Sequence, residues 1–160
     1  MARNIITNDV VPLLSALKQM YKAADFGANA TSLNVEQLVS IVDQIFFNYN
    51  KATDSWDSLV SETGSASAAE TVISDYIFPS PVDITTQLNL VRAETVVLMN
   101  GYQGSAFGAG SPEKTFSYTL SGNFLQDGHT EVAVSCGVLT AVNGFCSNLR
   151  TALEPLTDTV

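Results

Sequence analysis

The chain has 160 residues, a length typical of one compact domain, and its 16 acidic residues outnumber its 7 Lys and Arg, which leaves a net charge of −9. The cations are scattered along the chain, so no segment concentrates the positive field that nucleic acids or anionic membrane surfaces require. We therefore expect no direct nucleic-acid binding and no membrane binding.

Charged residues are also scarce. They make up 14% of the chain, where about 25% is usual. Because the centres of subunit interfaces are depleted in charge, this composition favours oligomeric packing. The alternative is a monomer with a polar but uncharged surface.

The two cysteines, Cys136 and Cys146, are too few for a disulfide framework or a closed zinc site. The N-terminal residues lack the apolar stretch of a signal peptide. No apolar run approaches the length of about 20 residues that spans a bilayer. We expect no metal, no cofactor and no secretion by a signal peptide.

Two helices are expected in the first 61 residues. Over 9–26, apolar residues recur at three- and four-residue steps, with Asn8 or Asp9 as the cap and Gly27 as the stop. Over 34–61 the same spacing continues for about seven turns. Poor helix formers near residues 50–54 leave a break in this second helix open.

Residues 62–82 are predicted to connect this helix to a third one, with a short helical or strand piece around 68–78. The third helix covers 83–100, with Asp83 as its cap and Gly101 as its end. Additional apolar residues on this helix predict that it is covered on more than one side. These residues are Leu90, Val96 and Val97.

Residues 101–128 are predicted to form an excursion from the helices, with a Gly-rich loop over 101–113. Alternation of Phe116, Tyr118 and Leu120 with polar residues predicts a strand, and a return strand could begin at Phe124. Two strands alone are marginally stable in water, so we expect this hairpin to lie against helices or a neighbouring subunit.

A last helix is predicted over 130–154, where the three- and four-residue spacing continues until Pro155. Asn143-Gly144 is a strong hairpin signal, so a hairpin is the alternative for this segment. Together these elements predict a single domain of the mainly α class. Its architecture is a four- to five-helix bundle with a Gly-rich loop and a short β-hairpin, and an α+β fold is the alternative. Its expected core comprises Val35, Leu38, Val42, Ile45, Leu88, Val91, Leu139, Val142 and Leu149.

No motif predicts catalysis or cofactor binding. The segment from Gly108 to Thr115 has the ends of a phosphate-binding loop, but Glu113 occupies the place of its second glycine, where a carboxylate opposes phosphate. The single histidine, His129, lies between Asp127 and Glu131 without a positioned nucleophile. We expect no catalytic, cofactor-binding or metal-binding residues.

The composition is similar to that of many structural proteins of bacteriophage particles, with low charge, abundant small polar residues and a Gly-rich segment. The leading hypothesis is a non-enzymatic, self-associating structural protein, a virion shell, neck or decoration component, located in the virion or the cytoplasm. Its expected partners are copies of itself or other structural subunits. The residues expected at the interface are Tyr102, Phe107, Phe116, Tyr118 and Phe124.

Two other functions remain open at this stage. One is a monomeric helical binding module for a peptide or small ligand, which requires a concave apolar pocket. The other is an enzyme with an unfamiliar site built on Asp127, His129 and Glu131.

Overall fold

The computed structural model describes residues 4–32, 35–77, 83–103, 115–121, 129–135 and 139–157, with side chains over 4–32, 36–76, 83–99 and 142–157. The fold is mainly α, as predicted. Its helices are a π-helical turn η1 (Ile6–Val10), α1 (Val11–Asn29), α2 (Val35–Thr63), α3 (Ala66–Ile77), α4 (Ile84–Gln103) and α5 (Leu139–Thr157). Two antiparallel strands, β1 (Thr115–Ser121) and β2 (His129–Ser135), precede α5.

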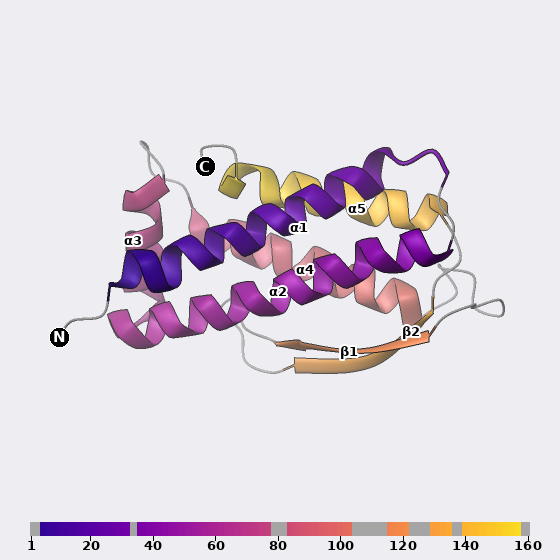
Figure 1. The fold of residues 1–160 in the computed structure, drawn as a ribbon. Coiled ribbons are helices and arrows are strands. Elements are labelled where there is room, and N and C mark those ends of the chain that lie inside the picture. Colours follow the sequence, from indigo (N-terminus) through magenta and orange to yellow (C-terminus); the bar gives the residue numbers. More distant parts are fainter. Residues whose placement is uncertain are drawn as a thin grey trace.

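The long helices lie side by side around one core, and the short helix α3 stands across the end where the chain begins (Figure 1). Helix α1 packs against both α2 and α5, and α5 packs against α4. On the remaining side, β1 contacts α2 and β2 contacts α4. The two strands therefore lie along one side of the bundle, against α2 and α4.

The first helix begins earlier than the predicted residue 9, and the predicted stop at Gly27 is wrong, because α1 continues to Asn29. Asn4 Oδ1 accepts a hydrogen bond from the Thr7 backbone N–H (3.1 Å), which satisfies a donor in the opening turn. Asp9 is not a cap: its side chain is buried, and its Oδ1 accepts a hydrogen bond from the Ser58 hydroxyl of α2 (2.7 Å). The sequence placed the start at residue 9 because an Asp near the start of a helix is usually an exposed cap. The sequence does not show that Asp9 is buried.

Helix α2 is continuous, so the break considered near residues 50–54 does not occur. Thr53 is buried, and its hydroxyl donates to the Asn50 carbonyl oxygen (2.9 Å), which satisfies it within the helix. The helix ends at Gly64, whose φ of 94° is in the left-handed region that favours glycine. The connection predicted over 62–82 contains helix α3.

Asp83 caps α4 as predicted, because its Oδ1 accepts a hydrogen bond from the Thr86 backbone N–H (3.0 Å). Hydrogen bonds from Thr86 hold the pKa of Asp83 below its usual value. The predicted end at Gly101 is wrong by two residues, since α4 continues to Gln103.

The helix predicted over 130–154 is wrong in its first part, because residues 129–135 form β2 and α5 begins at Leu139. Val132 fits a helical spacing with later apolar residues, but it also alternates with Val134, and pairing with β1 favours the strand. Strand β1 lies where alternation predicted a strand, and the return strand begins five residues later than Phe124.

The remainder of the last segment is helical through Asn143-Gly144, so the hairpin alternative is wrong there. The Asn143 side chain instead donates to the carbonyl oxygens of Gly27 and Ala30 (3.3 Å for Ala30), at the end of α1. Pro155 does not end α5, which continues to Thr157, although a proline at this position removes one backbone hydrogen bond of the helix.

The expected core residues whose side chains are described are all buried: Leu38, Val42, Ile45, Leu88, Val91, Val142 and Leu149. The side chains of Val35 and Leu139 lie outside the described part. Large aromatic residues of α2 complete the core, with Phe46, Tyr49 and Trp56 fully buried. The structure thus supports one continuous core beneath all the long helices.

Candidate self-association surface

Helix α4 carries apolar residues on more than one face. One face contributes Leu88, Val91 and Leu98 to the core. Successive residues of an α-helix are rotated by about 100°, so Leu90 and Val97 project about 80–180° away from these core residues. Both are large apolar side chains with substantial exposure, 44% for Leu90 and 43% for Val97.

Ala93 is also exposed and lies between Leu90 and Val97 on the same face. These three residues, spaced at three- and four-residue steps, form an apolar row that we call the α4 stripe. Solvated helix faces are normally polar. An apolar outer face on a helix is therefore a candidate contact surface for another molecule.

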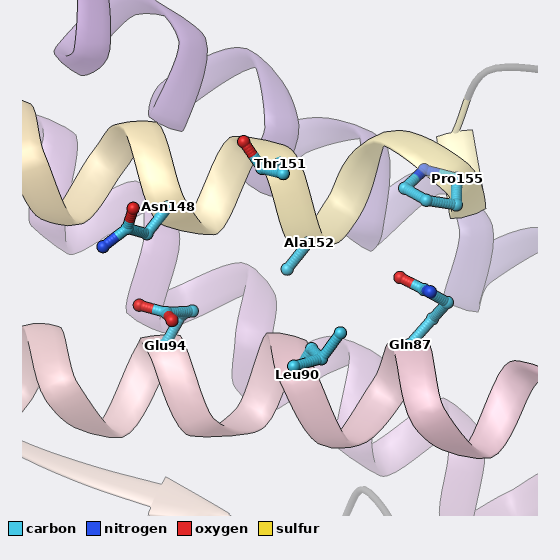
Figure 2. A pocket seen from close by; sticks show the side chains of 7 residues that line it. All are labelled: Gln87, Leu90, Glu94, Asn148, Thr151, Ala152 and Pro155. Atoms are coloured by element: carbon cyan, nitrogen blue, oxygen red, sulfur yellow. The ribbon is translucent and has the colours of Figure 1, made fainter.

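A groove lies next to the α4 stripe, between α4 and α5, with a volume of about 420 Å³ (Figure 2). Its lining residues are Gln87, Leu90 and Glu94 from α4, and Asn148, Thr151, Ala152 and Pro155 from α5. In Figure 2, Glu94 and Asn148 face each other at one end of the groove, and Gln87 lies near Pro155 at the other. The small Ala152 side chain leaves space between the helices, which a side chain from a partner can occupy.

The α4 stripe and the adjoining groove are poor in charge. Glu94 is the one ionisable residue that lines the groove, and the stripe itself contains none. The nearby cation of α5, Arg150, is paired with Asp25 of α1 at 3.2 Å. Glu94 lies four residues after Leu90 and three before Val97, so its carboxylate borders the stripe.

The remaining large apolar residues with high exposure lie on other elements. They are Val11, Phe26, Phe47 and Tyr76. Phe47 is partly covered by the ammonium of Lys51, which lies 5.5 Å from its ring centre. Singly exposed apolar residues of this kind are common on monomeric proteins. Among the side chains that the structure describes, only the α4 stripe places two of them within two turns of one helix. Phe26 lines a separate groove of about 460 Å³ between α1 and α2, together with Ala23 and Ile41.

A buried polar group lies on the side of α4 nearer to α2. Burial raises the pKa of Tyr49 to about 12, and the positive charge of Arg92 partly opposes that rise. Arg92 Nε and Asn89 Oδ1 are buried atoms for which the described residues supply no hydrogen-bond partner. Tyr49, Asn89 and Arg92 supply no nucleophile or proton acceptor that is reactive at neutral pH. We therefore assign these three residues a structural role.

The interface residues predicted from the sequence are only partly placed by the structure. Tyr102 lies in α4, and Phe116 and Tyr118 lie in β1, but their side chains are not described. Phe107 and Phe124 lie outside the described residues. Contact of these five residues with a neighbouring subunit stays a prediction, and the described strands contact α2 and α4 of their own molecule.

The α4 stripe was not among the predicted interface residues, although its signal was present in the sequence. Leu90 and Val97 were recognised as broadening the apolar surface of the third helix. Which of its faces would be covered within the chain could not be read from spacing, since that depends on where α5 and the strands pack.

The residues considered for an enzymatic site are only partly placed by the structure, and their side chains lie outside the described part. His129 and Glu131 lie in β2, and Asp127 is outside the described residues, as is the segment 108–114. No group of three or more metal-ligating side chains occurs among the residues searched. Across that same part of the chain, no helix combines the length and apolar character needed to cross a membrane.

Comparison of the chain with models of protein families, with curated proteins and with solved structures gave no match. The class of protein is therefore defined by the fold and the surface alone. It is a mainly α helical bundle with a charge-poor apolar stripe on its outer face.

Proposed function

We propose that this protein is a non-enzymatic structural subunit that associates with copies of itself through the α4 stripe. The observation that supports the proposal is the exposure of the apolar residues Leu90 and Val97 on the outer side of α4. Taking a fully exposed Leu or Val to full burial contributes about 1.5–3 kcal/mol. Leu90 and Val97 are 44% and 43% exposed, so covering them contributes less than half of that for each residue.

We further propose that the assembly is a bacteriophage virion component, such as a shell, neck or decoration protein. The acidic surface outside the α4 stripe is suited to such a role, because net charge keeps large assemblies soluble. The same charge opposes direct contact with the packaged genome. An outer or connecting position in the particle fits this distribution better than a genome-lining one.

Self-association can be tested by light scattering coupled to size-exclusion chromatography, over a range of protein concentrations. We expect the parent protein to form oligomers and Leu90→Glu or Val97→Glu to shift the distribution toward monomer. Each substitution places a charge where an apolar contact is expected, and weakens association by about tenfold or more. Far-ultraviolet circular dichroism should show unchanged helix content, because both positions are exposed.

Val11→Glu is the matched control, because Val11 is 44% exposed but lies on α1, away from the stripe. It should associate as the parent protein does. A parent protein that remains monomeric at the highest concentrations would contradict the proposal. Negative-stain electron microscopy of the associated protein then tests the virion role, which predicts particles of defined symmetry.

A further inference from the structure

We infer that the groove between α1 and α2 is a docking site for a peptide segment of a partner protein, one that carries a large apolar side chain next to a carboxylate. The groove has a volume of about 460 Å³, which is within the usual range of binding sites. Its lining residues come from α1 and α2 and not from α4, so the inference does not depend on the proposed self-association.

The groove has an apolar floor beside an exposed aromatic residue. Ala23 and Ile41 are buried, with 5% and 3% of their surface exposed, and they form the floor. Phe26 lines the same groove but is 57% exposed. Aromatic side chains anchor many protein contacts, because covering a ring removes a large apolar area from water. An apolar side chain of the partner therefore fits against the floor and Phe26.

The lining of this groove carries positive charge. It contains Lys22 and no Asp or Glu. Two other hollows in the described part of the chain each contain a carboxylate instead. These are Glu94 in the groove between α4 and α5, and Asp75 in a depression between the N-terminal residues and α3. In a chain with 16 acidic and 7 basic residues, the α1–α2 groove is thus suited to an anionic group, which the two carboxylate-lined hollows would repel.

The ammonium group of Lys22 is also not engaged within the chain. The other cations with described side chains each interact with another residue, and they are Lys18, Lys51, Arg92 and Arg150. Among the residues that the structure describes, no carboxylate pairs with Lys22. An ion pair between Lys22 and a ligand therefore replaces no existing pair, and the matching group on the partner is a carboxylate.

Polar side chains along the groove are suited to a peptide backbone. Gln19, Gln37, Ser40 and Gln44 belong to the lining. Gln44 Nε2 donates to Ser40 Oγ (3.1 Å), so the Ser40 hydroxyl can still donate and Gln44 Oε1 can still accept. A side-chain amide offers a donor and an acceptor, as does each peptide group. These groups favour a peptide segment over a simple amphiphile with an apolar tail.

The test uses a synthetic peptide, Gly-Glu-Leu-Phe-Gly, capped at both ends and added at millimolar concentration to isotope-labelled protein. In nitrogen–proton NMR spectra, the side-chain amide signals of Gln19, Gln37 and Gln44 should shift with the backbone signal of Lys22. A matched peptide with Gln in place of Glu should bind about two- to fivefold more weakly, the effect of one exposed ion pair. This difference should shrink at high salt.

Variants assign the contacts. Lys22→Gln should abolish the difference between the two peptides, and Phe26→Ala should weaken binding of both about fivefold or more. Lys51→Gln and Phe47→Ala are the matched controls, because this pair also places a cation beside an exposed aromatic ring but lies outside the groove lining. Both controls should bind the peptides as the parent protein does. Circular dichroism should show unchanged helix content in all four variants.

Equal binding of the Glu and Gln peptides, equal losses in the control variants, or no shift of the groove signals would overturn the inference. Octanoate that shifts these signals where the peptide does not would assign the groove to a small amphiphile. Loss of self-association in Phe26→Ala would assign it to a second copy. Leu90→Glu should bind the peptide normally, so failure of the proposed self-association leaves this inference standing.

Discussion

At the scale of single residues, Gly27 of α1 packs directly against Cys146 of α5. A Cβ atom added at Gly27 would lie 2.6 Å from Cys146 Sγ and 3.2 Å from a methyl carbon of Ile41. The Cys146 side chain is fully buried there, so it has little space to move. The glycine therefore permits the two helices to pack together.

Gly27→Ala is expected to destabilise the fold by about 1–3 kcal/mol, the usual cost of overpacking a core. Urea unfolding followed by circular dichroism measures the change. Gly144→Ala is the control, because an added Cβ at that helical position meets nothing within 4 Å, and it should stabilise slightly. In the Gly27→Ala/Cys146→Ala double variant, most of the loss should be recovered, and additive losses would contradict the close contact.

Two buried weak acids make the protein sensitive to alkaline pH. Burial raises the pKa of Cys146 from 9.0 to about 12 and that of Tyr49 from 10.0 to about 12. Both groups ionise at lower pH in the unfolded chain than in the folded one. The stability is therefore fully present below about pH 9 and falls as the pH rises from there toward 12.

The free energy of unfolding should accordingly fall between pH 9 and pH 12, by at most about 1.4 kcal/mol per pH unit for each group. Urea titrations at several pH values measure it. Tyr49→Phe and Cys146→Ala should each flatten the fall, whatever their effect at pH 7. A stability that stays constant up to pH 12 in the parent protein would show that neither group is buried.

At the scale of secondary-structure elements, Asn143 links the beginning of α5 to the end of α1. Its side-chain amide donates to the carbonyl oxygens of Gly27 and Ala30. The last carbonyl groups of a helix have no partner within that helix. Asn143 therefore takes the place of a local cap for α1.

Asn143→Ala should lower the free energy of unfolding by about 1 kcal/mol, the net value of a typical hydrogen bond. Asn143→Asp should cost more, because a carboxylate cannot donate and would be repelled by the carbonyl oxygens. Thermal unfolding of both variants tests this order. Equal effects of the two substitutions would argue against donation by the amide.

At the scale of the whole molecule, association and folding are linked. A subunit that associates only when folded gains stability by mass action. The melting temperature of the parent protein should therefore rise with protein concentration. Differential scanning calorimetry should show this rise in the parent protein and Val11→Glu, and its loss in Leu90→Glu. A melting temperature independent of concentration in the parent protein would contradict self-association.

Much of the fold could be predicted from apolar spacing, because a helix must bury one stripe wherever it packs. The core positions of α2, such as Leu38 and Ile45, followed directly from that spacing. The prediction failed where one pattern satisfies two structures. Val132 fits a helix and a strand equally well, and only its pairing opposite Tyr118 decides for the strand. The candidate surface was missed for a related reason, since Leu90 is apolar like any core residue.

The sequence by itself determined the class of fold, most of the helices and the low number of basic residues, because periodicity and charge are properties of the chain. The tertiary structure alone decided which apolar residues remain exposed and which polar residues are buried. Asp9 is enclosed beside Ser58, whereas Leu90 is exposed to solvent. The physical reason is that burial depends on which elements pack together, and local spacing carries no information about that choice.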